Sequence, residues 1–195
     1  MAKVSSICVY CASSTKIDRA YVDAAQEIGR LLAEKDIACV NGAGKMGLMG
    51  TVSDAALQNN GKVIGVIPQF MVDNGWFHSS LSELHVTQSM HERKQKMANL
   101  ADGCIALPGG IGTLEELIEV ITWKQLGLYN KPIVILNTKN YYDLLLKLLK
   151  QMANENFMRP MHTELWRVAQ TPAEAIQLIE EAEAWPDNYG KFAAL

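Results

Sequence analysis

The chain has 195 residues, of which 49% are hydrophobic and 20% are charged, with a net charge of −3 at pH 7. These values fit one globular domain with a sizeable core. The acidic charge argues against nucleic acid as a partner, and no apolar run approaches membrane-spanning length. The cysteines (Cys8, Cys11, Cys39 and Cys104) lie in or beside apolar runs. We therefore expect buried, reduced thiols in a cytoplasmic protein, and no metal site at the C-x-x-C of Cys8 and Cys11.

Short apolar runs alternate with helical patterns along the chain. The predicted strands are Ser6–Cys11, Ala38–Asn41, Lys62–Ile67, Glu83–Thr87, Gly103–Leu107, Pro132–Leu136 and a weaker Trp166–Ala169. The predicted helices are Arg19–Lys35, Met46–Asn60, Ser89–Leu100, Thr113–Leu126, Tyr141–Asn154 and Pro172–Ala184. This alternation predicts an α/β fold, a single Rossmann-like doubly wound parallel sheet with helices on both faces. We expect one domain over residues 1–184, a tail over 185–195, and a flap in the irregular segment 69–80.

Three loops are predicted at the carboxyl ends of strands, the edge where such sheets bind ligands. They are Ala12-Ser13-Ser14, the glycine loop 42–47, and the Pro108-Gly109-Gly110 turn. The last turn precedes a helix for which Thr113 is a plausible N-cap and Glu116 its capping-box partner. Glycines let the backbone approach a ligand, and the free N–H groups of a first helical turn suit a phosphate. The Ser13-Ser14 pair suits a phosphate hydrogen bond or a helix cap.

The glycine loop also raises the possibility of a dinucleotide site. Residues 42–47 have the spacing G-x-G-x-x-G. However, this loop follows the second predicted strand, and no acidic residue lies about twenty positions further on to hold a ribose hydroxyl. The pattern therefore gives little support to a dinucleotide cofactor, and we expect none.

Met90, Arg93, Lys94 and Met97 form a single stripe on a predicted helix. Neither cation has a carboxylate three or four positions away with which to pair on that helix. A solvated basic face is one interpretation of this stripe. The other is that Arg93 and Lys94 contact a ligand phosphate or leaving group, for which the planar arginine fork is well suited.

Two neighbouring glutamates on the next helix differ in their surroundings. Glu116 shares a helical face with Val120 and Trp123, whereas Glu115 aligns with Glu119 on a polar face. A carboxylate among apolar neighbours beside a ligand has a raised pKa and suits a general base. A favourable interaction with the helix dipole alone is the simpler explanation for a carboxylate near a helix start. We take Glu116 as the first candidate for chemistry.

With these motifs in view, the chain resembles the LONELY GUY family of cytokinin riboside 5′-monophosphate phosphoribohydrolases. The pattern P-G-G-x-G-T-x-x-E runs from Pro108 to Glu116, and M-x-x-R-K runs from Met90 to Lys94. Two further family blocks, G-L-M-G and I-T-W, stand at residues 47–50 and 121–123.

The resemblance implies a nucleotide-binding catalytic domain that forms a homodimer. Its expected reaction is hydrolysis of the N-glycosidic bond of an N6-substituted AMP to free base and ribose 5-phosphate, without a cofactor or metal. Arg93 and Glu116 correspond to the family's catalytic pair. We place in the substrate site Ser13, Ser14, Gly44, Met90, Lys94, Gly109, Gly110, Ile111, Gly112, Thr113, Leu114, Glu115 and Thr122.

Some features leave alternatives open. Members often carry the label lysine decarboxylase, but no lysine here has a recognisable pyridoxal-phosphate setting. The chain has Ala12 and Ala43 where the family commonly has glycine, and its Gly75 falls near a substrate-contacting glutamate of many members. The preference between prenylated and plain adenine is thus open. A nucleotide sensor without turnover, or ribose-phosphate transfer to an acceptor other than water, would use the same phosphate site.

Overall fold

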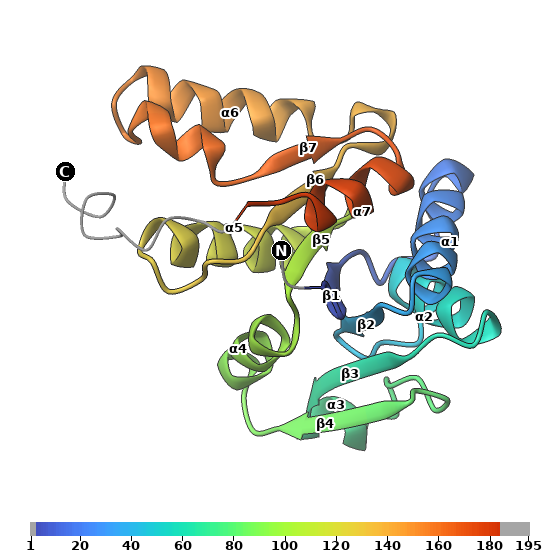
Figure 1. The fold of residues 1–195 in the computed structure, drawn as a ribbon. Coiled ribbons are helices and arrows are strands. Elements are labelled where there is room, and N and C mark those ends of the chain that lie inside the picture. The colour runs from blue at the N-terminus through green and yellow to red at the C-terminus, as the bar shows by residue number, and fades with distance from the viewer. Residues whose placement is uncertain (1–2, 184–195) are drawn as a thin grey trace.

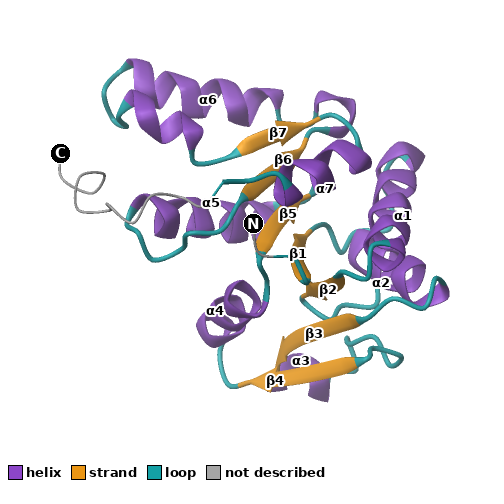
Figure 2. Ribbon diagram, in the orientation of Figure 1, coloured by secondary structure: helices purple, strands orange, loops and turns teal. Residues whose placement is uncertain are grey.

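A computed structural model describes residues 3–183 of the chain, and the predicted tail over 185–195 lies outside these residues. The described part is built on one seven-stranded sheet with the order β4-β3-β2-β1-β5-β6-β7 (Figure 1). Every neighbouring pair of strands is parallel. Figure 2 shows helices on both sides of this sheet, as in a doubly wound Rossmann-like fold. The predicted fold class is confirmed.

The predicted strands and helices are all present, with ends that shift by a few residues. The strands are β1 (Ser6–Tyr10), β2 (Ala38–Asn41), β3 (Val63–Pro68), β4 (Glu83–Thr87), β5 (Gly103–Ala106), β6 (Ile133–Leu136) and β7 (Arg167–Ala169). The α-helices are α1 (Arg19–Glu34), α2 (Gly47–Gln58), α3 (Gln69–Asp73), α4 (Met90–Leu100), α5 (Ile111–Gln125), α6 (Asp143–Asn154) and α7 (Pro172–Glu180). Residues 3–183 also include two 3₁₀ turns, Thr138–Asn140 and Pro160–Glu164.

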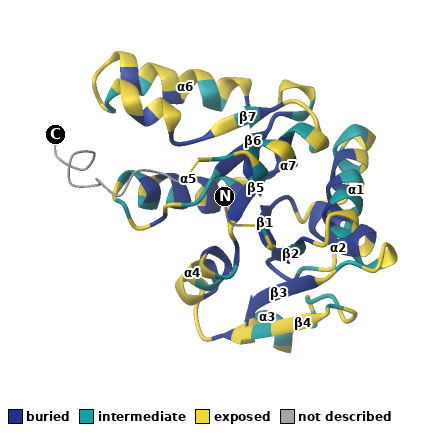
Figure 3. Cartoon of the chain, viewed as in Figure 1, coloured by how far each residue is buried: buried dark blue, intermediate teal, exposed yellow. Residues whose placement is uncertain are grey.

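The alternation of side chains along each strand divides the core into two layers. Helices α1, α2 and α7 pack on one face, against residues such as Ile7, Val9 and Ile105. Helices α4, α5 and α6 pack on the other face, against Cys8 and Tyr10 among others. The central strands are buried on both faces, and the exposed residues lie on the outer helix surfaces, on β4 and in connecting loops (Figure 3). This double coverage explains why these strands read as continuous apolar runs.

The same packing places the two cysteines of the C-x-x-C motif on opposite faces of the sheet. Cys8 belongs to the core on the α4 side, and Cys11 belongs to the core on the α1 side. Both thiols are free and buried, as are Cys39 and Cys104. Burial raises the pKa of Cys8 and of Cys11 well above the usual value, which leaves these thiols protonated and unreactive. Within residues 3–183, no helix has the length and apolar character to cross a membrane.

The strand order also fixes where a ligand binds. From β1 the chain adds β2, β3 and β4 on one side, and then returns to place β5 against the other edge of β1. The loops that follow β1 and β5 therefore leave the sheet in opposite directions, which opens a crevice at the carboxyl ends of these strands. Ala12 N–H donates to Pro108 O at 3.3 Å and joins the two loops at the base of this crevice.

Candidate active site

A cavity of about 670 Å³ opens at this switch point, a size suited to a small-molecule ligand. All three loops predicted from the sequence contribute to it: the loop after β1, the glycine loop after β2 and the turn after β5. Of the predicted site residues, the following line it: Ser13, Ser14, Gly44, Met90, Arg93, Gly110, Ile111, Gly112, Thr113, Glu115 and Glu116. Four others do not line it, namely Lys94, Gly109, Leu114 and Thr122.

The turn after β5 differs from its predicted form. Helix α5 begins at Ile111 with Gly110 as its N-cap, and no side chain caps it. The capping box predicted for Thr113 and Glu116 is therefore wrong, because both residues already lie inside the helix. Thr113 instead packs against Gly109, where an added Cβ would lie 2.1 Å from the threonine Oγ1. The first N–H groups of α5 have no side-chain cap, and the residues that carry them line the cavity, an arrangement that suits an anion.

Two glycines of this turn face open space. A Cβ added at Gly110 or Gly112 would meet no atom within 4 Å. Neither residue has a positive φ that would require glycine. The protein interior thus gives no reason for glycine at these positions, whereas a ligand lying against the backbone does.

Glu116 is the carboxylate that the structure buries beside this turn. Only 8% of the residue is exposed, and its carboxylate makes no hydrogen bond or ion pair within residues 3–183. Burial raises its pKa to about 7, a shift that the positive charge of Arg93 opposes. The raised pKa inferred from its apolar neighbours is confirmed. Near neutral pH this group can exchange a proton with a ligand or a water molecule.

Arg93 faces the same cavity from α4. Its Nε donates to Val66 O at 3.0 Å and its Nη2 donates to Gly42 O at 2.9 Å. Burial lowers its pKa, an effect that the charge of Glu116 opposes, and the guanidinium remains charged because its ordinary pKa is so high. The two carbonyls fix the plane of the guanidinium and leave further N–H groups for a ligand.

The glycine loop makes room for this arginine. A Cβ on Gly42 would lie 1.8 Å from Arg93 Nη2, and Gly47 has a φ of +62° close to the backbone of Ser13. The G-x-G-x-x-G spacing therefore serves the packing of Arg93 and of the β1 loop.

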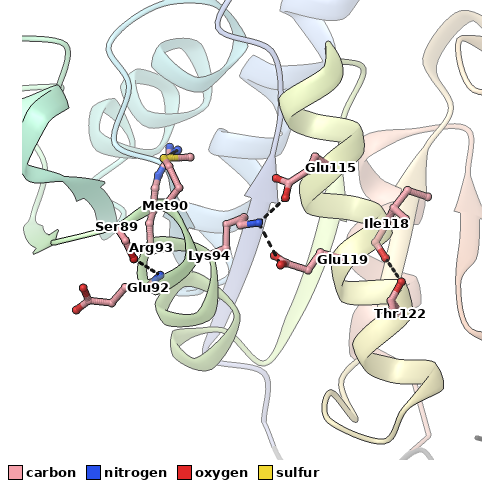
Figure 4. A network of polar contacts seen from close by, with 9 residues as sticks. All are labelled: Ser89, Met90, Glu92, Arg93, Lys94, Glu115, Ile118, Glu119 and Thr122. Carbon is pink, nitrogen blue, oxygen red and sulfur yellow. Dashed lines mark hydrogen bonds and ion pairs between the residues drawn. The ribbon is translucent and has the colours of Figure 1, made fainter.

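Lys94 lies outside the cavity lining in this structure. Its amine forms ion pairs with Glu115 and, at 3.1 Å, with Glu119, and only 6% of its side chain is exposed. Figure 4 shows Lys94 reaching from α4 to α5, whereas Arg93 extends beside Met90 in another direction. The partners of Lys94 lie 21 and 25 residues away in sequence, so the absence of a partner within α4 was a misleading signal. In this chain its charge links two helices.

The other predicted residues outside the cavity have structural contacts. Thr122 Oγ1 donates to Ile118 O on the outer side of α5, and Leu114 packs against the core. The cavity also has lining residues that the sequence did not single out as binding residues. They are Cys11, Ala12, Gly42, Lys45, Met46, Met49, Ile67, Met71 and Trp76.

The apolar side chains among these lining residues form what we call the apolar wall: Met46, Met49, Ile67, Met71 and Trp76. Segment 69–80 contributes Met71 and Trp76 to it. This segment contains the short helix α3 and is tied to the glycine loop by several hydrogen bonds. Lys45 Nζ donates to Gly75 O at 2.6 Å, and His78 N–H donates to Ala43 O at 2.8 Å. In this structure the segment predicted to be a flap is hydrogen-bonded to the glycine loop and lines one side of the cavity. Its Met and Trp side chains provide a polarisable surface for a flat ring.

Comparison with known proteins identifies the family of the chain. A family model described as "Possible lysine decarboxylase" matches residues 49–179. The chain is 43% identical to the probable cytokinin riboside 5′-monophosphate phosphoribohydrolase LOGL2 of Oryza sativa subsp. japonica, over 90% of this chain and 72% of that protein. It is 41% identical to the cytokinin riboside 5′-monophosphate phosphoribohydrolase LOG3 of Arabidopsis thaliana, over 92% of this chain and 83% of that protein.

Solved structures support the fold at lower identity. The molybdenum cofactor binding protein from Rippkaea orientalis superposes with a TM-score of 0.70 at 22% identity, covering 92% of this chain and 97% of that one. The molybdenum cofactor carrier protein from Chlamydomonas reinhardtii gives 0.71 at 20% identity, covering 91% and 96%. These structures show the fold alone, whereas the matched family model and the two relatives at 43% and 41% identity show that the chain belongs to the LONELY GUY family of phosphoribohydrolases.

Proposed function

We propose that this chain hydrolyses the N-glycosidic bond of a nucleoside 5′-monophosphate whose base is an N6-substituted adenine, releasing the free cytokinin-type base and ribose 5-phosphate. The observation that carries the proposal is the buried Glu116 carboxylate, with a pKa of about 7, in one cavity with the free N–H groups of α5. A phosphate site alone has no need of a carboxylate, because two negative charges repel each other.

In the proposed reaction the phosphate lies on the first turn of α5, at Gly110, Ile111 and Gly112. This contact supplies binding energy remote from the reacting bond, and it positions the sugar beside Glu116. The apolar wall that includes Met71 and Trp76 takes the base and its N6 substituent.

The bond between C1′ and the base nitrogen breaks with its electron pair passing to the base, which takes up a proton from solvent, and Glu116 later returns to solvent the proton that it accepts. Positive charge then builds on the ribose, as in other glycosidic cleavages. The ionised form of Glu116 stabilises that charge and accepts a proton from the water whose oxygen bonds to C1′. Arg93 keeps part of Glu116 ionised at neutral pH, because its positive charge lowers the pKa of this carboxyl.

We further propose that the protein acts as a homodimer in the cytoplasm. Free, buried cysteines are typical of a reducing compartment. Support for a dimer comes from α5, where Ile111 and Ile118 expose 82% and 38% of their surface. These residues are seven positions apart and lie on one side of the helix, together with Thr122. A second copy placed there would cover apolar surface that is costly to leave in water.

The test is chromatography of products after incubating the protein separately with AMP and with N6-isopentenyl-AMP. Release of base and ribose 5-phosphate is expected from the wild type and from a Glu164→Gln control, which changes an exposed carboxylate outside the cavity. Glu116→Gln is expected to lose activity by orders of magnitude. If the wild type binds both nucleotides and leaves them intact over hours, the hydrolase proposal fails and the site is that of a nucleotide sensor.

A further inference from the structure

Three successive carbonyls of the turn after β5 are held by hydrogen bonds from outside the turn. Tyr142 Oη donates to Leu107 O at 2.7 Å, and Ala12 N–H donates to Pro108 O at 3.3 Å. Tyr141 Oη donates to Gly109 O at 2.7 Å. Each of these three carbonyls thus has a donor that is distant in sequence, and these contacts set the orientation of the backbone.

The orientation of a carbonyl determines that of the N–H in the same peptide group. A trans peptide is planar, so its N–H points away from its C=O. The carbonyl of Gly109 is directed at Tyr141, so the N–H of Gly110 points to the opposite side, where Gly110 lines the cavity. The part of the chain that the structure describes offers no backbone acceptor to the N–H of Gly110, Ile111 or Gly112.

The backbone conformation and the contacts of the segment around Tyr141 fix the position of this side chain. Lys139 and Asn140, directly before it, have φ values of +56° and +58°. Two successive left-handed residues other than glycine cost free energy and persist only where the surroundings impose them. Here Lys139 pairs with Asp18, at the start of α1. The ring of Tyr141 also packs edge-on against Tyr21, with ring centroids 5.8 Å apart.

We propose that Tyr141 is a positioning residue for the phosphate site: its hydroxyl fixes the Gly109–Gly110 peptide so that the Gly110 N–H is aimed at the substrate phosphate. This inference rests on the proposed function, because it takes phosphate as the ligand of this turn. A hydrogen bond to the carbonyl also polarises the peptide and makes the opposite N–H a stronger donor. Tyr141 itself does not line the cavity, so it acts only through the backbone.

The test compares Tyr141→Phe with wild type and with Tyr21→Phe, the neighbouring tyrosine that contacts the Tyr141 ring. Tyr141→Phe removes one hydroxyl and retains the ring of a residue that is 45% exposed, so we expect the fold to be retained. Affinity for inorganic phosphate is measured by calorimetry, and KM and kcat are measured with N6-isopentenyl-AMP. The same measurement with N6-isopentenyladenosine, which lacks the phosphate, isolates the contribution of the phosphate contact.

We expect Tyr141→Phe to weaken phosphate binding and raise KM for the nucleotide by about five- to tenfold, with kcat within about twofold of wild type. Reaction of the nucleoside and all properties of Tyr21→Phe should be unchanged. Unchanged phosphate affinity, or an equal loss with nucleotide and nucleoside, would overturn the inference. Because phosphate binding needs no turnover, this result is separate from the fate of the hydrolase proposal.

Discussion

Replacing Glu116 by glutamine tests the cost of burying this carboxylate independently of catalysis. The ordinary pKa of a glutamate is 4.5, and burial raises that of Glu116 to about 7. Each pH unit of difference corresponds to about 1.4 kcal/mol, so the ionised form costs the folded state about 3 kcal/mol at pH 8. The folded protein binds this proton more tightly than the unfolded chain. Stability is therefore lost as pH rises from 4.5 through about 7.

The assay is urea unfolding of the wild type and Glu116→Gln at several values between about pH 4 and pH 8. The glutamine does not titrate, so the difference in unfolding free energy isolates the charge of Glu116. We expect the variant to gain stability relative to wild type by about 1 kcal/mol at pH 5.5 and by about 3 kcal/mol at pH 8, taking pH 4 as reference. Any fixed cost of burying the amide shifts the whole curve and leaves this pH dependence unchanged.

A difference that stays constant between pH 4 and pH 8 would refute the reasoning, since it would mean that Glu116 titrates alike in the folded and unfolded chains. A difference that changes in the opposite direction would mean that a cation near Glu116 outweighs the effect of burial. Loss of activity in the same variant would then have to be explained by the shape of the site.

Three further measurements test the site. The kcat/KM for the nucleotide should rise with pH through about 7, because the ionised Glu116 is the active form; a pH-independent profile would contradict this assignment. Gly112→Ala should stabilise α5 by about 0.5–1 kcal/mol and weaken phosphate binding, as judged by melting and calorimetry; unchanged phosphate affinity would place the anion elsewhere. Lys94→Met should lower the free energy of unfolding in urea by about 1–3 kcal/mol, because it leaves Glu119 unpaired. Adding Glu119→Gln should restore part of this loss, and no restoration would argue against the ion pair as the cause.

Local patterns in the sequence determined most of the fold. The central strands are covered by helices on both faces, so their apolar runs are continuous and easily recognised. The P-G-G-x-G turn and the apolar neighbours of Glu116 are also local features, and they sufficed to predict a ligand site with a raised carboxylate pKa. The start of α5 was predicted two residues too late because Gly110 caps the helix without a side chain, so the sequence carries no capping signal there.

Contacts between distant residues decided the rest. Lys94 meets Glu115 and Glu119 only because α4 and α5 pack side by side on one face of the sheet. Gly42 has no space for a side chain because Arg93, 51 residues later, occupies it. The hold of Tyr141 on Gly109 spans 32 residues in the same way. Local periodicity carries no information on such pairings, since they depend on how the elements pack in three dimensions. The sequence by itself therefore determined which elements form and which turn lines the cavity, whereas the tertiary structure decided which charged side chains are paired elsewhere and which face that cavity.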